Sequence, residues 1–229
     1  MKKRKFSSEL AYVLGIVTLA VGCAFMGKAD FGFSMVVAPA YILSQVLSQF
    51  SDFFTFGTTE YIFQAFLLLL MVIVIRKFKI SYLFSFVTAV IYGYTLDGMN
   101  LLVGLAVPQV TLPLRFVFYV VGMVICSFGV AFMIRTYISA EVYELIVKEV
   151  PERFGLNLTK FKTAYDIVSC LVGVVMSFAF FGMWNFVGVS WGTFVCALVN
   201  GFLIGKFSSW IDNHLELTDS LPLRKIFDK

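Results

Sequence analysis

Charge is what this chain has least of. Only 14% of its 229 residues are Asp, Glu, Lys or Arg, whereas 60% are hydrophobic and the mean hydropathy is +0.90. Such a chain has too little polar surface to cover a soluble globule, so its composition predicts an integral membrane protein. At roughly 20 residues per transmembrane helix, the length allows about six spans. We therefore expect no room for a soluble enzyme domain.

Histidine and paired cysteine are also scarce. The single histidine, His214, lies in a polar C-terminal tail, which excludes a histidine metal site and a Ser-His or Cys-His nucleophile within the membrane. The four cysteines, Cys23, Cys126, Cys170 and Cys196, fall in apolar runs without a C-x-x-C pair, and we interpret them as packing residues. A Walker-type phosphate loop is missing as well. We expect no catalytic residue, no metal site, no cofactor and no enzymatic activity.

Apolar runs alternate with short polar segments along the chain. The first run follows a basic start and resembles a signal peptide, but its pattern recurs in mid-chain, so we expect it to be retained. The fifth begins with Thr163-Ala-Tyr-Asp166, which has the spacing of a capping box. The predicted spans are residues 10–26, 61–75, 82–103, 116–134, 164–183 and 192–207, followed by a polar tail over 208–229.

A pattern of Gly-x6-Gly-x-Ala-Phe-Met occurs twice, in residues 15–26 and again in residues 122–133. Two further matches follow in the same order: Thr59-Glu-Tyr with Thr163-Ala-Tyr, and residues 86–93 with residues 194–201. We interpret these matches as an internal duplication with a first repeat over 1–107 and a second over 108–207. The glycines that recur are candidate gating or packing positions: Gly15, Gly22, Gly93, Gly122, Gly129 and Gly201.

The distribution of basic residues predicts the orientation. With six spans and a cytoplasmic N-terminus, only Lys28 and Arg115 of the 18 Lys and Arg residues lie outside, which satisfies the positive-inside rule. Both termini are then cytoplasmic. The first and fourth spans run in opposite directions, so the two repeats are inverted, an arrangement typical of secondary transporters and channels.

A short helix is expected after the first span of each repeat. Residues 34–50 carry an uncharged polar stripe that includes Gln45, opposite an apolar stripe, which indicates a re-entrant or interfacial helix at the outer face. Residues 139–150 contain Glu141, Glu144, Lys148 and Glu149. Four charges at the bilayer centre would cost on the order of 10 kcal/mol, so this second helix does not span. The predicted fold is an all-α membrane protein of six helices in two inverted three-helix repeats.

Several short motifs resemble a known family. They are Asp30-Phe-Gly-Phe-Ser, Gly93-Tyr-Thr-Leu-Asp, Lys162-Thr-Ala-Tyr-Asp, and Val187-Gly-Val-Ser-Trp-Gly-Thr before Leu198-Val-Asn-Gly. Together they look like the bacterial YczE/YyaS/YitT-type integral membrane proteins over most of residues 10–207. The resemblance implies a multi-span inner-membrane protein without a settled substrate. Where a Pro-x-Asp pattern is usual after the fourth span, this chain has Val142-Tyr-Glu.

Polar residues within the spans are the candidate substrate-binding residues. Asp97 is the first of them, because Ala89, Gly93, Asp97 and Asn100 share one helical face whose small residues permit close approach. An alternative is that Asp97 pairs with Arg115 for packing. Glu60 and Asp166 lie near helix ends, where an acid is favourable through the helix dipole. The candidate substrate-binding residues are Asp97, Asn100, Tyr92, Asn200 and Gln45.

Three functional hypotheses follow from this organisation. The leading one is a small-molecule transporter or channel-like permease for a small organic solute, with a central site between the inverted repeats. The alternatives are a substrate-capturing membrane subunit of a modular ATP-driven importer and a non-transporting accessory protein. The lipid bilayer is the certain partner. A homo-oligomer or a membrane partner protein stays open, and the net charge of +4 needs no nucleic acid because basic cytoplasmic loops explain it.

Overall fold

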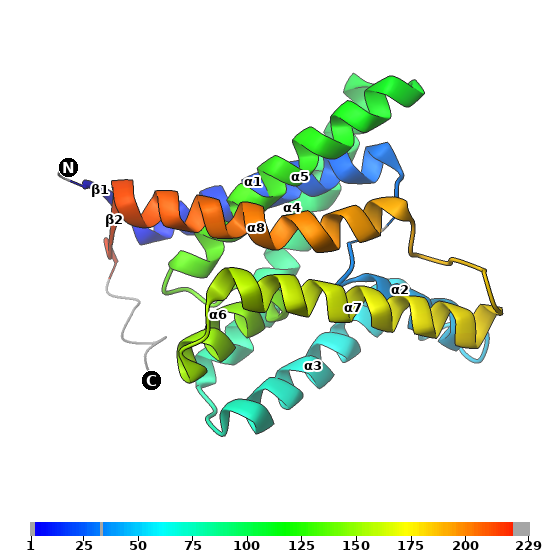
Figure 1. Cartoon of the computed structure of the whole chain (residues 1–229), viewed down its shortest axis with the longest axis horizontal. Coiled ribbons are helices and arrows are strands. Elements are labelled where there is room, and N and C mark those ends of the chain that lie inside the picture. The colour runs from blue at the N-terminus through cyan, green and yellow to red at the C-terminus, as the bar shows by residue number, and fades with distance from the viewer. Residues whose placement is uncertain (1–2, 33, 222–229) are drawn as a thin grey trace.

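Six long apolar helices dominate the computed structural model, which describes residues 3–32 and 34–221 (Figure 1). Within these residues six helices are long and apolar enough to cross a membrane, as the length of the apolar runs predicts, and they make a multi-pass membrane protein. They are α1 (Ser8–Ala29), α3 (Phe56–Ile75), α4 (Phe84–Ala106, entered through the 3-10 turn η1, Ile80–Leu83), α5 (Leu112–Arg135), α7 (Leu158–Phe181) and α8 (Trp191–His214).

The start of α7 differs from the expectation. The side chain of Asn157 accepts a hydrogen bond from the Lys160 amide and caps the helix, which begins at Leu158. The predicted capping box at Thr163-Ala-Tyr-Asp166 is therefore wrong, because these residues lie inside the helix. Asp166 is fully buried there, so the helix dipole at an exposed N-terminus does not account for this carboxylate.

Among the described residues, the most extensive helix–helix packing is between the antiparallel helices α1 and α5. A Cβ atom added to Gly22 would lie 2.6 Å from the main-chain oxygen of Gly122, and one added to Gly129 would lie 2.8 Å from that of Gly15. Only glycine permits two helix backbones to approach this closely. The glycines of the duplicated pattern thus meet in two cross-pairs at the centre of the bundle.

The remaining long helices flank this pair. Helix α4 packs on α1, and α8 packs on α5 and α7. Gly201 lies against Thr163 and Gly205 lies against Thr159, so α7 and α8 approach each other closely. The corresponding glycine of the first half, Gly93, has no neighbour within 4 Å of an added Cβ, and α3 does not pack closely on α4. The two halves therefore differ in how tightly their last two helices pack.

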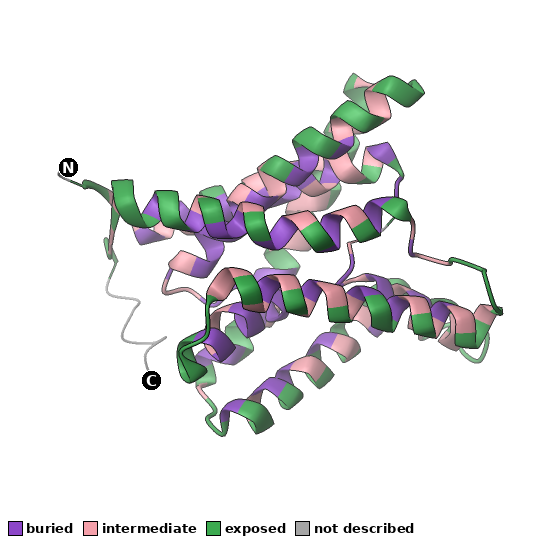
Figure 2. Ribbon diagram, in the orientation of Figure 1, coloured by how far each residue is buried: buried purple, intermediate pink, exposed green. Residues whose placement is uncertain are grey.

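Two short helices, α2 (Ala38–Leu47) and α6 (Val142–Phe154), fill the space between α3 and α7. Figure 1 shows them at opposite ends of α7. Most of α6 is buried despite its charges (Figure 2). In α2 the buried residues are Ala38, Pro39, Ala40, Ile42 and Ser44. The predicted apolar stripe therefore does not define the buried side of α2. The buried residues are instead those of its first two turns.

A parallel pair of short strands joins the two ends of the chain. Residues of β1 (Arg4–Ser7) pair with those of β2 (Leu215–Thr218), and the Glu9 carboxylate accepts hydrogen bonds from the Ser220 and Leu221 amides. The tail expected over 208–229 therefore begins as the last turns of α8 and then as a strand, and residues 222–229 lie outside the described residues. We call this end of the bundle the strand end (Figure 1).

The glycine contacts predict the effect of adding one methyl group. Gly22→Ala should destabilise the protein by about 1–3 kcal/mol, because the methyl meets backbone atoms of α5 that cannot turn aside. Gly98→Ala is the matched control within α4. Nothing lies within 4 Å of its added Cβ, and the change should stay within about 0.5 kcal/mol. Thermal unfolding of both variants in detergent tests this; equal stability would contradict the packing.

Candidate functional site

A group of buried polar side chains lies where α3, α6, α7 and α8 meet. Each is at most 7% exposed although the surrounding helices are apolar. We call this group the carboxylate cluster: Gln64 on α3, Glu141 and Glu144 at the start of α6, Lys162 and Asp166 on α7, and Asn200 on α8.

The members of the carboxylate cluster form a continuous chain of interactions. The Nε2 atom of Gln64 donates to Oε1 of Glu141 at 2.9 Å. The Glu144 carboxylate is attracted by the Lys162 ammonium and repelled by the Glu141 carboxylate. Lys162 Nζ donates to Asp166 Oδ1 at 2.7 Å. The cluster thus links α3 to α7 through the first turn of α6.

Two further polar contacts extend the cluster towards α5. The side chain of Asn200 lies beside the Asp166 carboxylate, and its Oδ1 atom accepts a hydrogen bond of 2.8 Å from the Ser127 hydroxyl. Ser127 is adjacent to Cys126, one of the residues against which Gly22 packs. The cluster is therefore anchored on the α1–α5 pair.

The start of α6 explains how two glutamates are held in the interior. Glu141 is the N-cap residue and Glu144 lies in the first turn. Unpaired backbone amides and the positive end of the helix dipole favour negative charge at that position. A helix that begins inside the bundle can thus hold carboxylates at a depth where a spanning helix would carry them at high cost.

The cluster holds more negative than positive groups. It contains three carboxylates, Glu141, Glu144 and Asp166, and one ammonium, Lys162. Four buried oxygen atoms at its edge have no hydrogen-bond partner in the structure: Gln64 Oε1, Glu144 Oε2, Asp166 Oδ2 and the Tyr143 hydroxyl. A buried acceptor without a donor is costly, so the site is complementary to a cation or to a group rich in hydrogen-bond donors.

The two glutamates of α6 hold protons more tightly than an exposed carboxyl does. Burial, and then the charge of Glu144, raises the pKa of Glu141 well above its ordinary value of 4.5. Burial also raises the pKa of Glu144, although the Lys162 ammonium opposes this. Desolvation disfavours the charged form of an acid, so both glutamates take up a proton more readily than an exposed carboxyl does.

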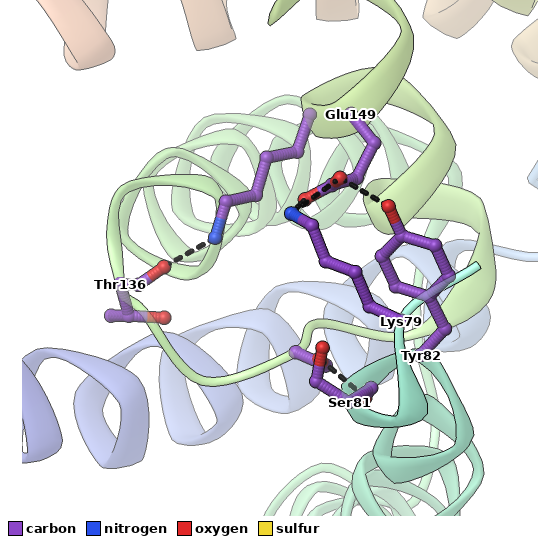
Figure 3. Close-up of polar contacts among 7 residues, drawn as sticks. Lys79, Ser81, Tyr82, Thr136 and Glu149 are labelled. Atoms are coloured by element: carbon purple, nitrogen blue, oxygen red, sulfur yellow. Dashed lines mark hydrogen bonds and ion pairs between the residues drawn. The ribbon is translucent and has the colours of Figure 1, made fainter. Parts of the chain in front are cut away.

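A cavity of about 300 Å³ lies at the strand end, where Ser8 and Leu217 are among its lining residues. Its polar walls include Lys79, Ser81, Tyr82, Ser139 and Glu149. Figure 3 shows Lys79 and Tyr82 both directed at the Glu149 carboxylate, with distances of 3.1 Å and 2.5 Å to its Oε2 atom. We call it the strand-end cavity.

The residues that the sequence singled out are not gathered in one place. Asp97, Asn100 and Gln45 are exposed. Asp97 forms no ion pair among the described residues, and Arg115 pairs with Asp30 at 2.9 Å, so the alternative of an Asp97–Arg115 pair is wrong. Only Asn200 of the five candidates belongs to the carboxylate cluster.

Tyr92 lies nearer the centre of the bundle but in another group. Its side chain lies beside the Cys23 thiol, which is 3.8 Å from that of Cys126. Tyr92 thus contacts Cys23 of α1, whereas Asn200 contacts Ser127 of α5. Within the described residues no group of three His, Cys, Asp or Glu side chains is arranged to hold a metal ion.

Sequence reasoning missed the centre of the site. It placed Glu141 and Glu144 on a helix at the membrane face, and it interpreted Asp166 as an acid at a helix end. The available signal was the pair Lys162 and Asp166, four residues apart on one helix face. An ion pair within an apolar run marks a buried polar site in a membrane protein.

The fold and the site define a multi-pass α-helical membrane protein with an acidic site buried in its bundle. The chain matches the model of DUF6198, a family of unknown function, over residues 6–209, and it belongs to that family. No curated protein and no solved structure matches it. An uncharacterised membrane family agrees with what the sequence motifs implied, and the match itself makes no link to YczE/YyaS/YitT-type proteins.

Loss of the ammonium should strongly destabilise the cluster. Lys162→Met leaves Asp166 and Glu144 without their cation, and removing one partner of a buried pair costs about 3–5 kcal/mol. The double change Lys162→Met with Asp166→Asn should recover part of this loss. Asp212→Asn, which breaks the exposed Arg135–Asp212 pair, should cost below about 1 kcal/mol. Thermal unfolding measures all three, and a Lys162→Met variant as stable as the control would contradict the role of the pair.

The raised pKa of Glu141 predicts a pH dependence of stability. A carboxyl whose pKa is raised in the folded state contributes stability at low pH and loses it as pH rises from 4.5 through the raised pKa. The titratable groups that interact with it are Glu60 and Tyr61 on α3, Tyr92 on α4, Tyr143 and Glu144 on α6, and Cys23 on α1. Glu141→Gln should therefore flatten the fall in melting temperature above pH 4.5, whereas Glu149→Gln should keep it. A wild-type protein whose stability rises with pH over that range would contradict this assignment.

Proposed function

We propose that this protein is a small-molecule permease whose central site is the carboxylate cluster, and that its solute is a small organic cation. The observation that carries the proposal is the set of buried, unpaired carboxylate oxygens on Glu144 and Asp166. Carboxylate oxygens that are buried in a membrane protein without a hydrogen-bond donor are costly, and acids at such positions characteristically serve a solute or ion pathway. A purely structural core would be cheaper to build from apolar residues.

The proposed architecture is a pair of inverted repeats. When each glycine is replaced by its counterpart in the other repeat, the Gly15–Gly129 contact becomes the Gly122–Gly22 contact, and this second contact is also present. The packing of α4 on α1 corresponds to that of α8 on α5, and α2 and α6 both lie between α3 and α7. These correspondences support a two-fold axis in the membrane plane. The carboxylate cluster then lies between elements of both halves, as solute sites of such transporters do.

The proposed membrane setting follows the basic residues. The strand end holds Lys79, Arg135 and Lys148, and the positive-inside rule directs such residues to the cytoplasm. We therefore place both chain termini in the cytoplasm of a bacterial cell and the protein in its inner membrane. We also propose kinship with YczE/YyaS/YitT-type proteins. Its support is the set of shared motifs in α4, in α7 and in the segment before α8.

The charge balance favours a cationic solute. An ammonium or guanidinium group would donate to the unpaired oxygens of Glu144 and Asp166 and would complete their hydrogen bonds. Aromatic rings adjoin the site: the Lys162 ammonium lies 5.6 Å from the centre of the Tyr165 ring, a geometry that suits cations. A proton on Glu141 and a solute cation would neutralise the same acids, so the two should compete.

Variants of two acids test the location of the site. In a thermal-shift screen against small organic cations, Glu144→Gln should weaken the solute response roughly 10- to 100-fold, because a hydrogen bond to a charged group contributes about 1.5–3 kcal/mol. The matched control Asp97→Asn should keep the response, since Asp97 lies on an exposed face. Uptake into proteoliposomes should follow the same order.

The opposite pattern would overturn the assignment. If Asp97→Asn abolished the response and Glu144→Gln kept it, the solute would bind at α4 and the carboxylate cluster would be structural. A wild-type protein that responds to no cation in the screen would contradict the permease function itself.

A further inference from the structure

The charged residues of α6 follow one face of the helix. Glu141, Glu144, Lys148 and Glu152 are spaced by three, four and four residues, which places them in one stripe along the helix. The first two belong to the carboxylate cluster. The last two line the strand-end cavity. One polar stripe thus connects the buried acids with a cavity that opens at the end of the bundle.

The polar stripe crosses a short apolar barrier. Leu145 lines the strand-end cavity and is only 1% exposed, and it lies between the two pairs of charged residues. Lys148 is held aside, because its ammonium donates to the main-chain oxygen of Thr136 at 2.5 Å. The distance from the cavity to Glu144 is therefore about one helical turn along α6.

The mouth of this route is bridged by contacts of Glu149. Its carboxylate receives the Lys79 ammonium and the Tyr82 hydroxyl, both from the turn that precedes α4 (Figure 3). The Ser139 hydroxyl, in the segment that leads into α6, donates to the main-chain oxygen of Ser81 at 2.7 Å. The Glu149 contacts hold α6 against η1, and the Ser139 contact holds the segment before α6 against the same turn.

We propose that the strand-end cavity is the inner entrance to the carboxylate cluster, and that the contacts of Glu149 with Lys79 and Tyr82 are the latch that closes it. This proposal rests on the proposed function. A solute cation that enters the cavity meets Glu149 first and competes with Lys79 for its carboxylate. When Lys79 is displaced, η1 is released from α6, and the route along the polar stripe opens.

The row of acids beyond the latch suits a cation and not an anion. The cavity itself is lined by acids and bases alike, among them Glu149 with Lys79 and Glu152 with Lys148, whereas the carboxylates of Glu144 and Glu141 follow deeper along the same stripe. Lys79 is paired with Glu149 at 3.1 Å, and its side chain is 27% exposed, so it can move into solvent when a competing cation arrives. An anion would have to pass the same row of carboxylates at a high electrostatic cost.

Thiol accessibility tests the latch directly. The reporter is Ser81→Cys, a near-isosteric change at a buried wall of the cavity, in a chain with Cys23, Cys126, Cys170 and Cys196 replaced by alanine. A membrane-impermeant maleimide is applied to inside-out vesicles. Glu149→Gln and Lys79→Met should each speed labelling about fivefold, the effect of losing a partly buried ion pair.

The control is Asp212→Asn, which removes a carboxylate from another ion pair at the same end and should leave the rate unchanged. Equal labelling in all four backgrounds would overturn the latch, as would an Asp212→Asn variant that labels as fast as Glu149→Gln. Lys79→Met keeps the Tyr82–Glu149 hydrogen bond. If Glu149→Gln does not fold, the labelling rate of Lys79→Met therefore tests the latch.

A second arm uses methylammonium as the probe cation. At constant ionic strength, methylammonium should speed the labelling of Ser81→Cys relative to sodium, and this effect should vanish with Glu149→Gln. Suppose that neither methylammonium nor the latch variants change the labelling rate, while Glu144→Gln still weakens the solute response. The proposed latch is then contradicted, and the proposed permease site is not. If Glu144→Gln has no effect, the proposed function itself fails.

Discussion

The contact between the backbones of α1 and α5 is the constraint on which the rest of the bundle depends. In a bilayer the lipid tails are as apolar as leucine, so helices associate through close packing and polar contacts. Gly15, Gly22, Gly122 and Gly129 supply the close packing. The pair then offers a firm surface to α4 on one side and to α8 on the other. Ser127 of α5 also donates a hydrogen bond to Asn200, the member of the carboxylate cluster that lies on α8.

The buried acids are compatible with this apolar bundle because a short helix supplies two of them. Helix α6 starts inside the protein with Glu141 as its N-cap residue and Glu144 in its first turn, where the positive end of the helix dipole favours negative charge. The spanning helices contribute a nearly balanced pair, Lys162 and Asp166, and an amide, Gln64. No spanning helix therefore carries an isolated charge in the cluster. The excess of acid over base is concentrated at one helix start, where a solute or proton can compensate it.

The difference between Asp97 and Asp166 illustrates where reasoning from the sequence failed. Helical spacing placed Asp97 on a face with small residues, and Asp97 and Asn100 on that face proved exposed, with open space at Gly93. Asp166 was set aside because the helix start was expected at residue 164 instead of Leu158. A capping residue earlier in the chain, Asn157, moves the aspartate from a helix end into the interior. A small error in a helix boundary thus changed the assignment of a buried charge.

The sequence by itself determined the six spans, the existence and non-spanning character of α6, and the glycines of the duplicated pattern. Each depends on a local property: the length of an apolar run, the cost of charge in lipid, or a repeated spacing. Only the tertiary structure decided how deep α6 lies, that Gly201 has a close neighbour while Gly93 has none, and that the chain ends pair as strands. Depth and contact depend on which helices surround a residue, and segments distant in the chain set that environment.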